Sequence, residues 1–203
     1  MFFNSTKLIL IFWILSLAVG IYSCQPKVLN NLTQLEQVND IKAKPLIDIS
    51  MGEEKTFRAK VSGFDQEMSG LLVVKKLDKE YRFVMVTDFG LKVFDLSLKS
   101  NAEYEFHHIM KHMDYEFLKN SLTLDMLMLL PIELNEEAEF YQKDDFVVYT
   151  PQKKMLYFVK DDKIHQVQRF RRKRNNWAEA KWTEKSIDIH QKKPEIHIQL
   201  KPL

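Results

Sequence analysis

Short runs of strand-forming residues recur along most of the chain, and no other sequence feature limits the fold more. Breaks rich in Asp, Asn, Gly and Ser separate these runs at roughly ten-residue spacing, which is typical of an antiparallel meander. The first runs are Lys55–Gly63, Gly70–Lys76, Tyr81–Asp88, Leu91–Leu98 and Ala102–Lys111. The later runs are Phe146–Thr150, Lys154–Lys160, Lys163–Arg172, Trp177–Trp182, Ile187–His190 and Glu195–Leu200. The sequence therefore predicts about eleven short antiparallel strands.

One segment replaces the strand pattern with a helical one. Tyr115–Leu130 contains no Gly or Pro and is followed by Pro131, so it predicts a helix. The second half of this segment is apolar nearly all round, with Asp125 as the polar exception. A helix that is apolar on every side is covered on every side, for example inside a curved sheet. The predicted fold is mainly β: a half-open, about eleven-stranded antiparallel β-barrel with an apolar plug helix.

Apolar side chains that share one face of these strands have two interpretations. The simpler one is an ordinary hydrophobic core. The alternative is a cavity that accepts acyl chains of varying shape, which the 9 Met residues favour because methionine adapts to irregular contacts. The residues predicted to line such a cavity are Leu72, Val74, Phe83, Met85, Phe94, Leu96, Phe106, Leu122, Met126 and Leu129.

The N-terminus has the pattern of a secretory signal. Lys7 is followed by the apolar run Leu8–Ile21, which as a helix would span about 21 Å and so falls short of the ~30 Å hydrocarbon core of a bilayer. The run ends in Ile21-Tyr22-Ser23-Cys24, which resembles a bacterial lipobox. That resemblance implies that Cys24 receives a diacylglycerol and becomes the mature N-terminus, with palmitate among the attached acyl chains. A cleaved signal or membrane anchor in which Cys24 is incidental is the alternative.

These patterns predict three regions. Residues 1–23 are a lipoprotein signal peptide, 24–50 a lipidated linker or short helix, and 51–203 the sheet domain. Leucines and other aliphatic residues three apart favour the helix in the second region, and Pro45 would end it.

Composition and motifs exclude several classes of function. With 30 Lys or Arg against 28 Asp or Glu the net charge is +2, so no nucleic-acid partner is predicted. A single cysteine allows neither an intramolecular disulfide nor a multi-cysteine metal site. His107 and His108 would point to opposite faces of a strand, so no metal site and no cofactor are predicted. No nucleophile elbow is present, so the protein is not expected to be an enzyme.

A longer stretch has a family resemblance. Tyr81–Leu98 reads YRFVMVTDFGLKVFDLSL, in which a strand ends in a Thr-Asp-Phe-Gly turn and returns as an alternating strand. It resembles the LolA/LolB family of outer-membrane lipoprotein-localisation proteins, and within it most closely LolB, the lipid-anchored receptor. Met68–Leu72 resembles the entry strand of that family, and the helix before Pro131 stands where the family has its inserted helices. The resemblance covers about Lys55 to Pro131.

The resemblance implies a function. The protein would be a lipid-anchored receptor on the periplasmic face of the outer membrane that accepts acylated lipoproteins in a hydrophobic cavity and helps to insert them into that membrane. Its implied partners are the acyl chains of lipoproteins or other lipids, the membrane, and a periplasmic LolA-like carrier. In the family the turn carries an exposed apolar residue before its glycine, so Phe89 and Gly90 are expected to form a membrane hook. The alternative is that Phe89 folds back onto the sheet.

Other functions stay open at this point. The same fold could serve a cell-envelope scaffold, a lipid sensor, a carrier of lipids other than lipoproteins, or a hydrolase with no visible motif. The basic run that begins at Arg169 is predicted to be a solvated hairpin end, with contact to anionic head groups as the alternative.

Overall fold

The computed structural model describes residues 32–35, 43–63, 65–99, 103–130, 138–152, 154–171, 175–183 and 185–203. All of them belong to one compact unit, Leu32–Leu203. The predicted signal peptide and Cys24 lie outside the described residues.

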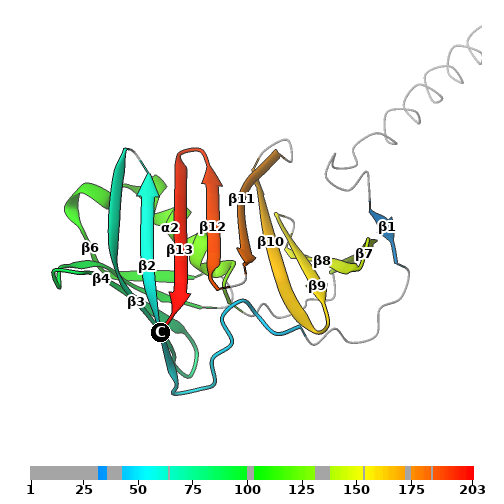
Figure 1. Ribbon diagram of the computed structural model, residues 1–203, viewed down its shortest axis with the longest axis horizontal. Coiled ribbons are helices and arrows are strands. Elements are labelled where there is room, and N and C mark those ends of the chain that lie inside the picture. Colours follow the sequence, from blue (N-terminus) through cyan, green and yellow to red (C-terminus); the bar gives the residue numbers. More distant parts are fainter. Residues whose placement is uncertain are drawn as a thin grey trace, which may run out of the picture. The chain divides into compact units, whose positions relative to one another are not determined.

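A single antiparallel sheet of thirteen strands contains most of the described residues (Figure 1). Its order is β1-β7-β8-β9-β10-β11-β12-β13-β2-β3-β4-β5-β6. The strands are β1 (Thr33–Gln34), β2 (Glu54–Gly63), β3 (Gln66–Lys76), β4 (Tyr81–Thr87), β5 (Lys92–Leu98), β6 (Tyr104–Ile109), β7 (Glu139–Lys143), β8 (Phe146–Gln152), β9 (Met155–Lys160), β10 (Lys163–Arg171), β11 (Asn175–Trp182), β12 (Ile187–Lys192) and β13 (Glu195–Pro202).

The predicted fold class is confirmed in its coarse features and wrong in its strand number. The sheet is antiparallel, and it is open, because its edge strands β1 and β6 do not pair with each other. The predicted count of eleven omitted β1 and β7. Two residues of β1 cannot show an alternating pattern, and β7 has the mainly polar sequence EFYQK. The helix considered for residues 24–50 is also wrong at Thr33–Gln34, where the chain pairs with β7 as a strand.

Alternation along the central strands separates an inner apolar face from an outer face. In β4 the buried residues are Tyr81, Phe83 and Met85, and their neighbours in between are half-buried. The partners of these residues in β5 are Leu98, Leu96 and Phe94, which are also buried. Side chains on one face of paired strands pack together, so the inner faces of these strands supply much of the core.

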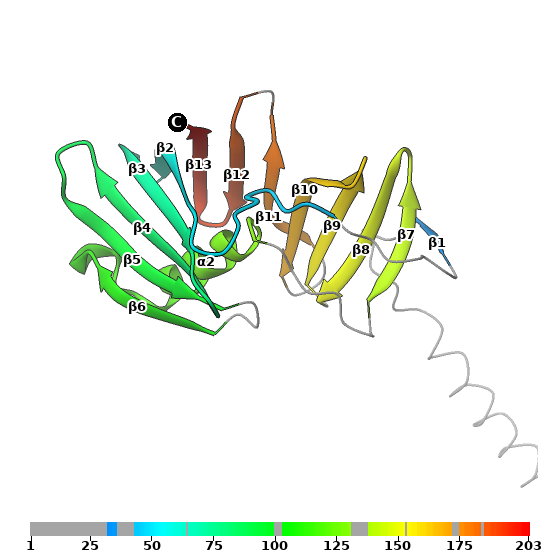
Figure 2. The ribbon, with the colours of Figure 1, turned by 90° about the horizontal axis from the view of Figure 1, so that it is seen from below.

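The helix α2 (Glu116–Leu127) packs against that inner face, preceded by the short 3-10 helix η1 (Lys111–Met113) (Figure 2). It begins and ends within the predicted range of 115–130. Residues 125–130 are all buried, as a segment without a polar side requires. The last turn tightens, because Leu129 and Leu130 donate their N–H groups to the carbonyls of Met126 and Leu127.

The chain ahead of β2 also belongs to the core. Leu46, Ile47 and Ile49 are buried, and Ile47 N–H donates to the carbonyl of Leu129 after α2. The indole of Trp182 in β11 donates to the carbonyl of Leu46. Residues 43–50, which the sequence analysis assigns to the linker, thus fasten the end of the helix to the sheet.

Candidate functional site

A groove and a cavity lie between α2 and the inner face of the sheet. The outer groove, about 720 Å³ in volume, is lined by Val61, Gly63, Gln66, Glu67, Met68, His112, Met113, Tyr115, Phe117, Leu118, Pro194 and Ile196. The inner cavity, about 80 Å³, is lined by Ala59, Val61, Met68, Leu72, Met85, Val93, Phe94, Met113, Leu118, Ser121, Leu122, Asp125, Met126, Ile196, Ile198 and Leu200. Both walls combine residues of β2 and β3 with residues of β13 and α2, so the site lies where β2 and β13 pair.

The predicted lining residues divide into two groups. Five line the inner cavity: Leu72, Met85, Phe94, Leu122 and Met126. The others pack in the core cluster away from both walls, four of them fully buried and Phe106 partly: Val74, Phe83, Leu96, Leu129 and Phe106. The sequence analysis missed the contributions of β2 and β13, such as Val61 and Ile196. Their strands alternate as others do, but the sequence carries no sign that β2 and β13 are neighbours.

Aromatic side chains lie at the entrance of the outer groove. Tyr115 and Phe117, at the start of α2, are 62% and 47% exposed and line this groove. Methionine side chains also form part of the wall: Met68, Met85 and Met113 line the groove or the cavity. Methionine walls adapt to ligands of differing shape.

A buried polar cluster fixes α2 to the sheet at the wall of the inner cavity. Arg169 in β10 donates to Asp125 over 2.6 Å and to Gln191 in β12 over 3.3 Å, and Ser121 donates to Gln191. Burial raises the pKa of Asp125 to about 7, and the Arg169 guanidinium opposes this rise. Burial also lowers the pKa of Arg169. The cluster joins the helix to two strands across an otherwise apolar interface.

Arg169 also corrects the prediction made for the basic run. It is only 4% exposed and faces the core rather than solvent. The sequence of a basic run does not show which of its side chains faces the core. Asp125 in the apolar helix does indicate, however, that a buried basic partner is needed. The side chains of the other members of this run lie outside the described part of the chain.

The β4–β5 hairpin presents the most exposed large apolar side chain among the described residues. Phe89 is 93% exposed and Leu91 is 60% exposed. Gly90 has φ +79°, and its N–H donates to the carbonyl of Thr87, so a left-handed glycine closes the turn. Residues 88–91 connect β4 to β5, whereas the predicted strand runs left only Phe89 and Gly90 between them. Arg58 contacts Asp88 at 2.6 Å, and this ion pair braces the base of the loop.

The hairpin and the outer groove share one end of the strands. Thr87, the last residue of β4, pairs with Gly70 in β3, and Met68 in the groove wall is two residues further along β3. Gly63, at the end of β2, also lines the groove. Paired residues of neighbouring strands lie side by side, so the end of β4 and the groove lie at the same end of the strands. The exposed Phe89, just beyond β4, therefore lies at that end as well.

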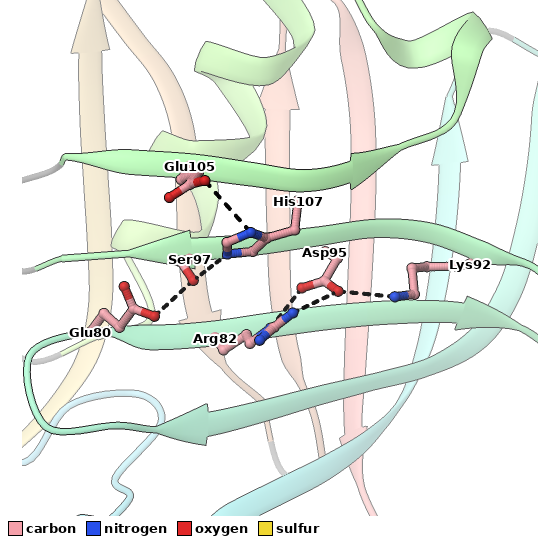
Figure 3. Close-up of polar contacts among 7 residues, drawn as sticks. All are labelled: Glu80, Arg82, Lys92, Asp95, Ser97, Glu105 and His107. Atoms are coloured by element: carbon pink, nitrogen blue, oxygen red, sulfur yellow. Dashed lines mark hydrogen bonds and ion pairs between the residues drawn. The ribbon is translucent and has the colours of Figure 1, made fainter.

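The outer face of β4, β5 and β6 carries a polar network (Figure 3). The hydroxyl of Ser97 lies 2.9 Å from Nε2 of His107 and donates to Glu80 over 2.9 Å, while Glu105 is 3.7 Å from Nδ1 of that histidine. This resembles a nucleophile beside a base. The single hydroxyl proton of Ser97, however, goes to Glu80, which leaves His107 as the donor rather than the base. The network therefore links β5 and β6 to Glu80, just before β4, and Ser97 is not activated as a nucleophile.

A separate cluster on the same face holds a carboxylate between two cations. Asp95 accepts from Arg82 over 2.8 Å and from Lys92 over 3.0 Å (Figure 3). Hydrogen bonding to Arg82 lowers the pKa of Asp95 to about 2, although its burial acts in the opposite direction.

Among the described residues, no group of three His, Cys, Asp or Glu side chains could hold a metal ion. His107 is the extra residue of a β-bulge, because Asp95 pairs with His108 and Leu96 pairs with Phe106. Within the same part of the chain, no helix is long and apolar enough to span a membrane.

Comparison with known proteins gives matches of structure only. No family model matches the sequence, and no curated protein matches it. A domain from Vibrio parahaemolyticus described as an outer membrane lipoprotein-sorting protein domain is similar at 6% identity and TM-score 0.45, over 73% of this chain and 82% of that one. A LolA superfamily protein from Nitrosomonas europaea is similar at 9% identity and TM-score 0.43, over 74% and 83%. A DUF1329 family protein from Desulfovibrio piger is similar at 9% identity and TM-score 0.40, over 75% and 84%.

Proposed function

We propose that this protein is a lipid-anchored receptor that holds the acyl chains of lipoproteins in the groove beneath α2 and helps to insert them into the outer membrane. The observation that carries the proposal is the apolar groove, which continues into a cavity between a wholly buried helix end and the inner face of the sheet. The volume of the outer groove, about 720 Å³, lies within the range of ligand sites, which are mostly apolar and concave.

The exposed hairpin supports the delivery step of this function. A carrier must release acyl chains into a bilayer without exposing them fully to water, because each exposed methylene costs about 0.8 kcal/mol. Phe89 lies at the same end of the sheet as the groove and is 93% exposed, so it can enter a membrane close to the point of release.

The anchor and the location belong to the same proposal. The lipobox resemblance at Cys24 supports acylation of that residue and a place on the periplasmic face of the outer membrane, with a LolA-like carrier as the donor of cargo. Replacement of Cys24 by Ala should abolish labelling of the protein by a fatty-acid probe. Since holding and passing a lipid breaks no covalent bond, the proposed function is not that of an enzyme.

Displacement of a hydrophobic fluorescent probe from the full chain tests the binding step. A triacylated peptide should displace the probe, and the same peptide without acyl chains should not, because only the alkyl chains match the groove wall. The variant Phe117→Ser should weaken the displacement, since this side chain lines the groove and is already half exposed. Equal competition by both peptides would contradict the proposal.

Phospholipids serve as the comparison ligand in that experiment. If they displace the probe as well as the triacylated peptide does, the protein carries lipids in general, and the receptor function for lipoproteins is wrong.

A further inference from the structure

The groove and the cavity described above are two parts of one channel. Five half-buried residues line both: Val61, Met68, Met113, Leu118 and Ile196. Met113 comes from η1 and Leu118 from α2, on one side, while the other three come from β2, β3 and β13. A single layer of side chains therefore separates the outer groove from the inner cavity, and we name these five residues the neck.

We infer that the inner cavity receives the methyl end of one acyl chain, and that Met113 and Leu118 in the neck set how far a chain can extend. This inference rests on the proposed function, because it assumes that an acyl chain occupies the outer groove. It names the ligand class more closely: single long alkyl chains that enter with the methyl end first.

The chemistry of the two compartments determines the orientation of the chain. Beyond the neck the wall is apolar except for Ser121 and Asp125, and both side chains are already engaged by Gln191 or Arg169. A carboxyl or ester group placed there would lose its hydrogen bonds to water and find no free partner. The outer groove has Gln66, Glu67 and His112 on its wall, so a polar head group can stay hydrated there.

The size of the inner cavity limits its occupant. At about 80 Å³ it is small beside the outer groove, which leaves room for the last few carbons of a chain and none for a second chain. Met85 and Met126 on its wall have unbranched side chains that can change rotamer, so the cavity can widen slightly as a chain enters. Chain length should therefore matter in steps of single methylenes near this limit.

Photo-crosslinking in the full chain tests the position of the methyl end. The probes are octanoic and hexadecanoic acids that carry a diazirine at the methyl end, and mass spectrometry identifies the labelled peptides. The hexadecanoic probe should label Met85, Phe94 or Met126 in the inner cavity, and the octanoic probe should label Tyr115 or Phe117 in the outer groove. Label from the longer probe only in the outer groove would overturn the inference.

Variants of the neck provide the second arm. Leu118→Trp should narrow the neck and move the hexadecanoic label outward, and inner-cavity labelling should fall about tenfold, the factor expected when two methylenes are kept from an apolar site. Met113→Trp should narrow the neck from the side of η1 and lower the inner-cavity labelling in the same way. The matched control is Phe117→Trp, which places the same side chain one residue away in the outer groove and should leave the inner label in place.

The outcomes separate this inference from the function on which it rests. Thermal unfolding of each variant shows whether it is folded before labelling is compared. Saturable labelling that is equal in Leu118→Trp, Met113→Trp and the unaltered protein overturns the role of the neck and leaves the binding function intact. If neither probe gives saturable labelling, the proposed binding function itself is wrong.

Discussion

Asp95 shows how a single residue on the outer face couples stability to pH. Its pKa is lowered to about 2 by Arg82, and Lys92 contributes as well. A carboxylate whose pKa is lower in the folded chain than in the unfolded chain stabilises the fold at higher pH, and this stabilisation is lost as pH falls through the folded pKa. Since both cations are partly exposed, solvent reduces the contribution to about 1–2 kcal/mol.

We therefore expect the free energy of unfolding to fall between about pH 4 and pH 2, the window set by the two pKa values of Asp95. Denaturant titrations across that range measure it. The variant Asp95→Asn should have a lower free energy of unfolding near neutral pH and a weaker dependence on pH below it. A dependence as steep as that of the unaltered protein would assign the acid sensitivity to other carboxylates.

Phe89 provides a prediction about function at the same scale. Because the side chain is 93% exposed, Phe89→Glu should change the free energy of unfolding by no more than about 0.5 kcal/mol and leave acyl-peptide binding nearly unaltered. Transfer of bound acylated peptide to liposomes should nevertheless be blocked, since a charged tip cannot enter the hydrocarbon region.

Phe89→Leu is the control for that experiment and should transfer cargo at close to the normal rate, because leucine keeps an apolar tip. Fluorescence transfer from protein to labelled liposomes reports both variants. If Phe89→Glu transfers cargo at the normal rate, Phe89 does not act as a membrane hook in the delivery step.

At the level of elements, the helix was predictable from sequence more closely than the strands. Tyr115–Leu130 has no helix breaker before Pro131, and the observed α2 lies within that range. Strand β7 was missed because its residues are mainly polar, and the loop at Phe89 was misjudged because the register shifts between Met85 and Val86. A bulge depends on how two strands fit together, and a single strand sequence does not carry that information.

The attachment of α2 to the sheet gives a prediction at this scale. Asp125→Leu should destabilise the fold by about 3–5 kcal/mol, because it leaves the buried charge of Arg169 without a counter-charge. Arg169→Met alone should have a similar effect, since it isolates Asp125.

The double variant Asp125→Leu with Arg169→Met should recover most of that loss, because apolar side chains replace both members of a buried ion pair. Denaturant unfolding of the four proteins gives the coupling energy. Simple addition of the two single effects would show that the pair does not hold the helix to β10.

For the whole molecule, the sequence indicated the helix and most of the strands, but it did not indicate the order of the strands in the sheet. Alternation and the apolar helix predicted an open antiparallel sheet with a helix on its inner face, and both are observed. That β13 lies beside β2 could not be inferred, because neither strand carries a signal that names its partner. The groove wall was therefore only half predictable: its β4, β5 and α2 residues followed from local patterns, while Val61 and Ile196 depend on this one pairing.

The pairing of β13 with β2 also affects the order in which the parts of the molecule fold. Phe57 pairs with Pro202, so the runs β7–β13 and β2–β6 of the sheet are joined only by the pairing of β2 with β13, two strands far apart in the sequence. Long-range strand pairing of this kind is slow, since a large loop must close first. Until it forms, β2 and β3 have no opposite wall and the groove does not exist. A chain in which β13 has not yet paired with β2 therefore has no groove, and on the proposed function acyl chains can be bound only after this pairing has formed.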